Sequence, residues 1–192
     1  MTTKSETITD EIITEEIITE KTSGQSVNVK KMVICAMGIA LTFVSTAFIN
    51  LRLPITANGG LIHLGNAALF IIAILFGKKI GAVAGGVGMA LFDLMGGWFL
   101  WAPFTFIVVG LMGYVVGLIG EKKKNTGWMI LAIALALILK ISGYYIAEGI
   151  IYGNWIAPIT SIPGNIVQVV IGGVIALPVA LPLTKITRKM GL

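Results

Sequence analysis

The sequence predicts an all-α membrane protein, a bundle of six transmembrane helices with both termini in the cytoplasm. Three observations carry this prediction: a very apolar composition, six apolar segments of membrane-spanning length, and basic clusters confined to alternate loops. Of the 192 residues, 56% are hydrophobic and 12% are charged. Soluble domains carry about 25% charged residues. A water-soluble core of this size could not hide so much apolar surface, so lipid must solvate part of it.

The six segments follow from the thickness of a bilayer, whose core of about 30 Å needs roughly 20 apolar helical residues. They are Met32–Asn50, Leu61–Gly77, Ile80–Leu100, Phe104–Gly120, Trp128–Ile151 and Ile162–Leu183. The second is short, and the third is rich in glycine, which lets neighbouring helices approach closely. We therefore expect residues 30–192 to form one transmembrane domain.

The basic residues orient these spans. They cluster before the first span, between the second and third, between the fourth and fifth, and after the sixth: Lys30-Lys31, Lys78-Lys79, Lys122-Lys123-Lys124, and Lys185, Arg188 and Lys189. With six crossings, all four clusters fall on one side of the membrane, which the positive-inside rule assigns to the cytoplasm. The predicted opposite loops carry only Arg52.

Residues 1–29 are polar and contain the repeat Glu-Ile-Ile-Thr-Glu twice in succession. A five-residue period drifts around a helix and makes no stable apolar face. We expect a flexible polar cytoplasmic tail, with a short surface helix as the alternative.

Polar side chains within the spans gather in the half away from the basic clusters. Because polar groups are costly in hydrocarbon, each one needs a reason. Their shared depth predicts an outward-facing cavity between the helices. The candidate substrate-binding residues are His63, Asn66, Asp93, Trp98, Trp101, Thr105, Tyr144, Glu148, Asn165 and Gln168. Among them, Tyr144 and Glu148 continue a stripe that begins at Lys140, because residues four apart share one helix face.

Structural explanations stay open for several of these residues. Lys140 can form an ion pair with Asp93, or balance Glu148 through a neighbour. Asn165 and Gln168 can form hydrogen bonds between helices instead of binding a ligand. Three tryptophans near the predicted outer interface can form an aromatic belt instead of binding a ligand: Trp98, Trp101 and Trp155.

The sequence argues against catalysis and against bound metal. It contains no Gly-x-x-x-x-Gly-Lys-Ser/Thr phosphate loop, no His-Glu-x-x-His motif and no Ser/His/Asp arrangement. One cysteine, Cys35, and one histidine exclude an intramolecular disulfide and a histidine-rich metal site. We expect no catalytic residues, no metal and no bound cofactor. The basic excess reports membrane topology, so no nucleic-acid partner is expected.

Five segments of the chain form an ordered set of motifs. They are Ala36-Met37-Gly38-Ile39-Ala40, Ile62-His63-Leu64-Gly65-Asn66-Ala67, the glycine-rich run Gly85 to Leu94 with its late Asp93, Trp101-Ala102-Pro103-Phe104-Thr105, and Pro163-Gly164-Asn165-Ile166-Val167-Gln168. In this order they resemble the S components, the substrate-binding subunits, of energy-coupling factor (ECF) vitamin transporters, and the first looks like that family's Ala-x-x-x-Ala motif. The resemblance covers roughly residues 30–190.

The resemblance implies a partner set and a location. Such a subunit captures a vitamin outside the cell and docks on a transmembrane coupling protein that carries two ATP-binding cassette ATPases. ATP would then bind in the partner subunits and not in this chain, and the protein would lie in the bacterial plasma membrane. Ala36 and Ala40 would face the coupling protein.

The resemblance also implies a gate and a substrate class. The loop Leu51–Leu61 would cover the site, through Pro54, Asn58, Gly59 and Gly60. The subgroup that the chain resembles handles pyridoxine or the hydroxymethylpyrimidine precursor of thiamine. Riboflavin or another vitamin is an alternative substrate, and a self-sufficient small transporter or channel is an alternative function.

Overall fold

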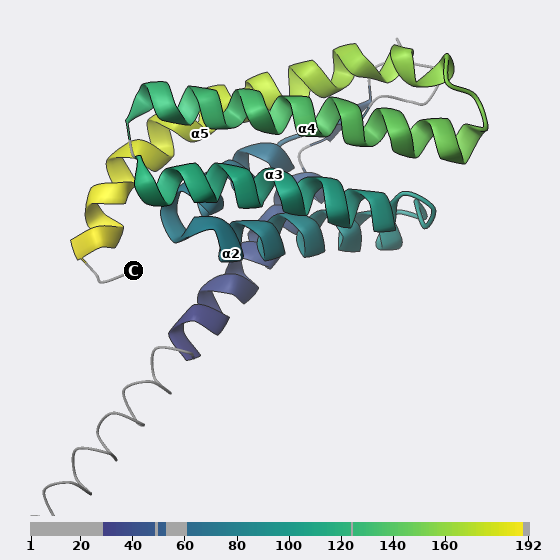
Figure 1. Cartoon of the computed structure of the whole chain (residues 1–192). Helices are drawn as coiled ribbons and strands as arrows, with labels where there is room; N and C mark the ends of the chain where they lie inside the picture. The colour runs from purple at the N-terminus through teal and green to yellow at the C-terminus, as the bar shows by residue number, and fades with distance from the viewer. Residues whose placement is uncertain (1–28, 49, 53–60, 124, 190–192) are drawn as a thin grey trace, which may run out of the picture. The chain divides into compact units, whose positions relative to one another are not determined.

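The computed structural model describes residues 29–48, 50–52, 61–123 and 125–189. The elements follow in the order helix Val29–Phe48, β1 Asn50–Arg52, β2 Leu61–His63, α2 Gly65–Met95, α3 Ala102–Lys122, α4 Thr126–Tyr152, the 3-10 helix η1 Ala157–Ser161 and α5 Ile162–Lys189 (Figure 1). In this part of the chain, five helices are long and apolar enough to cross a membrane. The expected helical membrane architecture is thereby confirmed.

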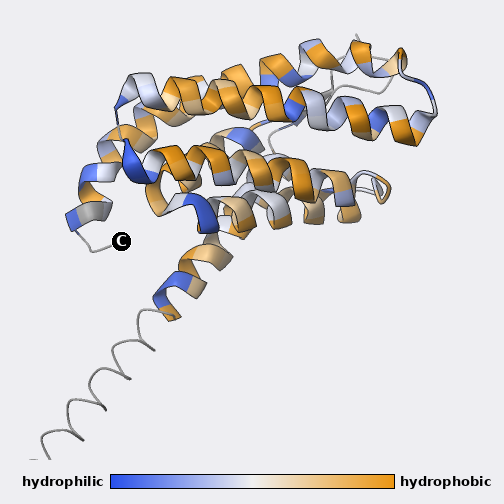
Figure 2. Cartoon of the chain, in the orientation of Figure 1, coloured by the Kyte–Doolittle hydropathy of each residue, from blue (hydrophilic) through white to orange (hydrophobic). Residues whose placement is uncertain are grey.

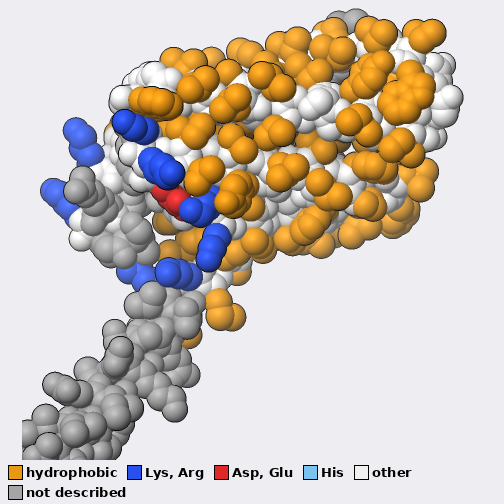
Figure 3. All heavy atoms as spheres, viewed as in Figure 1, with side chains coloured by type: hydrophobic (Ala, Val, Ile, Leu, Met, Phe, Trp, Pro, Cys, Tyr) orange, Lys and Arg blue, Asp and Glu red, His pale blue; other side chains and the backbone are white. Residues whose placement is uncertain are grey.

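Apolar side chains cover the outside of the helices as well as their core. Hydrophobic residues surround each long helix (Figure 2) and dominate the face seen in Figure 3, where Lys and Arg side chains gather at one end. Large side chains such as Phe99, Ile138 and Val174 are exposed. A helix that is hydrophobic all round is typical of a membrane span, because lipid solvates its outer face.

Helix α2 reverses direction at Gly77. This residue has φ 85° and ψ −177°, a non-helical conformation that only glycine adopts without strain. The two halves then lie antiparallel: a Cβ added at Gly81 would sit 2.6 Å from the Cβ of Ala73, and one added at Gly85 would meet the side chain of Leu69. The second and third predicted spans are therefore the two halves of one chain segment that folds back on itself.

The start of the second half is held by a carboxylate from α3. Glu121 accepts a hydrogen bond from the backbone N–H of Lys78 at 3.0 Å, and its other oxygen lies 3.0 Å from Lys78 Nζ. This bond satisfies one of the N–H groups that a helix start leaves without an intrahelical partner. The turn of α2 and the end of α3 therefore lie together at the basic end of the bundle.

The ends of two predicted spans are wrong. Leu61–His63 is a strand and not the start of a helix: it pairs antiparallel with β1, with Asn50 opposite His63. The second half of α2 ends at Met95 and not at Leu100, because the chain turns at Gly97, whose φ is 83°. The expected gate residues Pro54, Asn58, Gly59 and Gly60 lie outside the described residues. Of the expected tail at residues 1–29, only Val29 is described, and it begins the first helix.

The core lies where α2, α3, α4 and α5 meet. Its buried side chains include Leu69, Phe70, Val109, Met112, Met129, Ala132, Val169 and Ala176. The crossing of α2 with α3 is especially close, since a Cβ added at Gly86 would lie 2.8 Å from the carbonyl oxygen of Phe106. Glycine at such a crossing allows backbone contact that no other residue permits. This packing fixes the helix ends that carry the site.

Candidate functional site

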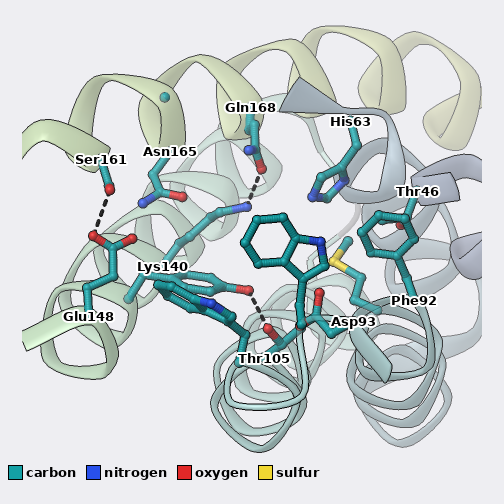
Figure 4. A pocket seen from close by; sticks show the side chains of 15 residues that line it. Thr46, His63, Phe92, Asp93, Thr105, Lys140, Glu148, Ser161, Asn165 and Gln168 are labelled. Atoms are coloured by element: carbon teal, nitrogen blue, oxygen red, sulfur yellow. Dashed lines mark hydrogen bonds between the residues drawn. The ribbon is translucent and has the colours of Figure 1, made fainter. Parts of the chain in front are cut away.

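A cavity of about 140 Å³ lies among the helix ends opposite the turn at Gly77. It is lined by residues of the helix Val29–Phe48, β2, α2, the α2–α3 turn, α3, α4, η1 and α5 (Figure 4). The lining residues are Thr46, His63, Met89, Phe92, Asp93, Trp98, Trp101, Thr105, Lys140, Tyr144, Glu148, Ser161, Gly164, Asn165 and Gln168. Segments from the whole transmembrane domain thus converge on one site.

The end of α2 and the start of α3 supply one wall. Asp93 lies in the last turn of α2, and its carbonyl oxygen accepts the backbone N–H of Trp98 at 2.7 Å, which closes the turn toward α3. The Asp93 Oδ2 atom is buried and has no hydrogen-bond partner among the described residues. Thr105, one turn into α3, is buried with its Oγ1 3.1 Å from the hydroxyl of Tyr144. This wall presents a carboxylate beside aromatic rings.

Helix α4 supplies a second wall through the stripe at positions 140, 144 and 148. Lys140 is only 2% exposed, and its Nζ lies 5.6 Å from the centre of the Tyr144 ring. The Lys140 Nζ donates a hydrogen bond of 2.7 Å to Gln168 Oε1 on α5. Within the described part of the chain, no ion pair within 4.0 Å joins Lys140 to Asp93 or Glu148. Of the alternatives left open for Lys140, the ion pair with Asp93 is therefore not formed, and Lys140 makes an ammonium–amide hydrogen bond to Gln168 instead.

The end of η1 and the start of α5 complete this wall. Asn165 and Gln168 are three residues apart on α5 and share one helix face, and Ser161 is the last residue of η1. The Ser161 hydroxyl donates to Glu148 Oε2 at 2.6 Å. Asn165 is half-buried and faces the same space, as Figure 4 shows. The Lys140–Gln168 bond therefore joins α4 to α5, and the Glu148–Ser161 bond joins α4 to η1, on one side of the cavity.

His63 approaches from β2. Its ring lies 6.5 Å from that of Phe92, and its Nδ1 accepts the backbone N–H of Gly65 at 3.2 Å. Burial lowers the pKa of His63 from 6.5 to about 3, and the nearby Lys140 ammonium acts in the same direction. His63 is therefore neutral at physiological pH. Because Nδ1 accepts, Nε2 carries the proton and can donate to a ligand.

The structure brings nine of the ten predicted site residues to this cavity, and their role in binding stays a prediction. Asn66 is the exception. It is fully buried, and a Cβ added at Gly172 of α5 would lie 2.8 Å from the Asn66 Cβ. The predicted span Leu61–Gly77 would put His63 and Asn66, three residues apart, on one helix face, whereas α2 begins only at Gly65 and His63 lies in β2. The change from strand to helix between them turns Asn66 toward α5.

Six lining residues lie outside the predicted set: Thr46, Met89, Phe92, Lys140, Ser161 and Gly164. Met89 precedes Asp93 by one helical turn, so helix periodicity could have identified it. Ser161 lies in η1, which the sequence did not predict, and no pattern indicated it.

The predicted interface tryptophans divide between two roles. Trp98 and Trp101 line the cavity. Trp155 does not: its ring lies 6.1 Å from that of Tyr145, whose hydroxyl donates to the Trp155 carbonyl oxygen at 2.7 Å. Trp155 therefore fixes the α4–η1 connection and is 53% exposed.

Comparisons with known proteins agree with this architecture. Residues 26–185 match the family described as ECF-type riboflavin transporter, S component. The chain is 34% identical over 149 residues to the thiamine precursor transporter HmpT of Lactococcus lactis subsp. cremoris, covering 78% of this chain and 84% of that protein. It is 36% identical over 124 residues to an uncharacterized protein of Pyrococcus woesei, covering 65% of this chain and 82% of the relative.

A third similarity is shorter. A UPF0397 protein of Streptococcus pneumoniae is 37% identical over 91 residues, which is 47% of each chain. The family match spans most of the transmembrane helices and all of the cavity residues. The chain therefore belongs to the family of ECF-type transporter S components, the membrane-embedded substrate-binding subunits of these importers.

Proposed function

We propose that this S component captures a small heterocyclic vitamin or vitamin precursor from outside the cell, with hydroxymethylpyrimidine or pyridoxine as the favoured substrate. The observation that carries the proposal is the cavity itself. It combines the rings of Trp98, Trp101 and Tyr144 with a carboxylate, Asp93, and an ammonium, Lys140. Flat rings stack on aromatic side chains, and a few placed polar groups orient them.

Size favours a single-ring substrate. The cavity of about 140 Å³ is well below the roughly 300–1,000 Å³ typical of sites for drug-sized ligands. The thiamine precursor named for the Lactococcus relative supports the same choice. Riboflavin is the second candidate, because the family description names it. Its three fused rings and sugar chain would require the cavity to widen.

We infer six crossings with both termini in the cytoplasm, counting each half of α2 as one crossing. The turn at Gly77 and the end of α3 carry Lys78, Lys79 and Lys122. By the positive-inside rule this end faces the cytoplasm. The cavity would then open toward the outside, as capture of an external solute requires. The loop that includes Pro54 and Gly59 would be its gate.

Transport would be driven by partner subunits: a transmembrane coupling protein and two ATP-binding cassette ATPases. Ala36 and Ala40 on the helix Val29–Phe48 are exposed and small, so a partner helix could approach closely there. We expect this chain to bind neither ATP nor another cofactor, and to catalyse no reaction by itself.

Mass spectrometry of small molecules retained through purification tests the substrate directly. We expect hydroxymethylpyrimidine or pyridoxine, and titration of the substrate-free protein should reproduce its binding. Riboflavin in the spectrum would favour the second candidate. Ion-driven uptake into vesicles that contain this chain alone would instead favour a self-sufficient transporter.

A further inference from the structure

The basic end of the bundle carries more positive charge than its described acidic residues balance. Four lysines lie around the turn of α2 and the end of α3: Lys78, Lys79, Lys122 and Lys123. Glu121 is the one acidic residue at this end in the described part of the chain, and it already pairs with Lys78 at 3.0 Å. The other two described acidic residues line the cavity. These four lysines and one glutamate leave a net charge of +3, and Figure 3 shows this excess of Lys and Arg side chains.

A shallow groove lies beside Lys123 at the start of α4. It is lined by Asn125, Gly127, Trp128 and Leu131. The Lys123 Nζ lies 5.4 Å from the centre of the Trp128 ring, so the ammonium sits over the aromatic side of the groove. The Asn125 side chain accepts the backbone N–H of Trp128 at 2.9 Å, which fixes the first turn of α4. Because tryptophan is enriched at the depth of lipid headgroups, the Lys123 ammonium is expected at that depth as well.

An exposed apolar stripe continues from this groove along α4. Its members follow one another at three, four and three residues and therefore share one helix face: Trp128, Leu131, Leu135 and Ile138. Ten residues of helix at 1.5 Å each give the stripe a length of about 15 Å. That is half of the bilayer core of about 30 Å. The stripe thus matches the depth that the acyl chains of one leaflet fill, with the Lys123 ammonium at its headgroup end.

From these features we propose that an anionic phospholipid binds at the start of α4, with its phosphate group at Lys123 and an acyl chain along the stripe from Trp128 to Ile138. The uncompensated positive charge favours an anionic headgroup over a zwitterionic one. The stripe favours a lipid over an acidic protein segment, because a water-soluble partner cannot follow it into the hydrocarbon. The inference requires only that these helices lie in a membrane, and it is independent of the substrate that the cavity takes.

Native mass spectrometry of the purified full-length chain in detergent tests this site. The lipids are phosphatidylglycerol and phosphatidylcholine with identical acyl chains, so only the headgroup charge differs. We expect the wild-type protein to bind phosphatidylglycerol at least about fivefold more tightly, the contribution of one basic side chain close to an anionic lipid. Equal binding of the two lipids would overturn the inference without any variant having to fold.

Two variants separate the groove from the general positive charge of this end. Lys123→Gln should weaken phosphatidylglycerol binding about fivefold and leave phosphatidylcholine binding unchanged. Lys185→Gln removes the same charge from an exposed position near the end of α5, outside the groove lining, and should change either affinity by less than about twofold. Equal losses in the two variants would show diffuse attraction and overturn the assignment to the groove.

Two competitors identify the occupant. Glycerol phosphate, which is a headgroup without acyl chains, should not displace phosphatidylglycerol at equal concentration, because the stripe contributes through the chain. Displacement by it would reduce the site to one for a free phosphate and overturn the inference. A polyglutamate peptide should also leave the lipid bound, and displacement by that peptide would assign the surface to an acidic protein segment instead.

Discussion

The hydrogen bond between Lys140 and Gln168 should be the strongest polar contact between α4 and α5. Lys140 is 2% exposed, Gln168 is 8% exposed, and their atoms lie 2.7 Å apart. Neutral interhelical hydrogen bonds in membranes are worth about 0.6 kcal/mol on average, whereas hydrogen bonds to charged groups reach about 1.5–3 kcal/mol. Gln168→Leu leaves the buried ammonium without this acceptor, and should lower the free energy of unfolding by about 2–3 kcal/mol.

Replacing Lys140 should lower the free energy of unfolding by less than replacing Gln168. Lys140→Met keeps the length of the side chain and removes the buried charge, so we expect a loss of about 1–2 kcal/mol. The double variant should be more stable than the sum of the two losses predicts, by a coupling energy of about 1–2 kcal/mol. Denaturation by SDS in mixed micelles, followed by tryptophan fluorescence, measures all four proteins.

A double-mutant cycle between two distant sites gives the baseline for this coupling energy. Lys140→Met combined with Glu121→Gln pairs two distant sites and should be additive within about 0.5 kcal/mol. If the Lys140–Gln168 cycle gives a coupling no larger than this baseline, the two side chains do not stabilise each other. The orientation assigned to the Gln168 amide would then be wrong.

Three further predictions concern binding and assembly. Asn165→Ala should weaken substrate binding by about threefold or more, since the residue faces the cavity; unchanged affinity in a titration would clear it of a direct role. Ala36→Trp or Ala40→Trp should reduce co-purification with the coupling protein while substrate affinity is kept, and loss of binding with intact assembly would refute the docking assignment. His63→Gln should change affinity by the same factor at every pH from about 5 to 8, because the pKa of His63 falls from 6.5 to about 3 through burial. A factor that changes near pH 6.5 would show that His63 titrates there.

The lowered pKa of His63 also determines the direction in which its contribution to stability changes with pH. His63 is neutral in the folded protein and has its usual pKa of 6.5 when unfolded. Its contribution to stability is therefore fully present above about pH 6.5 and is lost as the pH falls toward 3. Comparing the unfolding of wild type and His63→Gln across this range isolates the contribution.

The types of residue and their spacing along the sequence were enough to predict much of the site. Apolar length and the exclusion of charge predicted the membrane helices, because no other element satisfies its own backbone in lipid. Helix periodicity placed Tyr144 and Glu148 with Lys140, and Asn165 with Gln168, since each pair lies on a single continuous helix. The cost of polar groups in hydrocarbon singled out Asp93 and Thr105.

The tertiary structure decided what periodicity could not. Asn66 does not share a helix face with His63, because His63 belongs to a strand that pairs with β1 and the helix starts only after it. Lys140 donates its hydrogen bond to Gln168 and not to Asp93. Residue spacing in the sequence does not determine which side chains of different helices meet, because that depends on how the helices pack. The sequence by itself therefore determined which helices cross the membrane and which polar residues they carry. Packing decided which of those residues face one another across the cavity, because side chains on separate helices meet only once the bundle has formed.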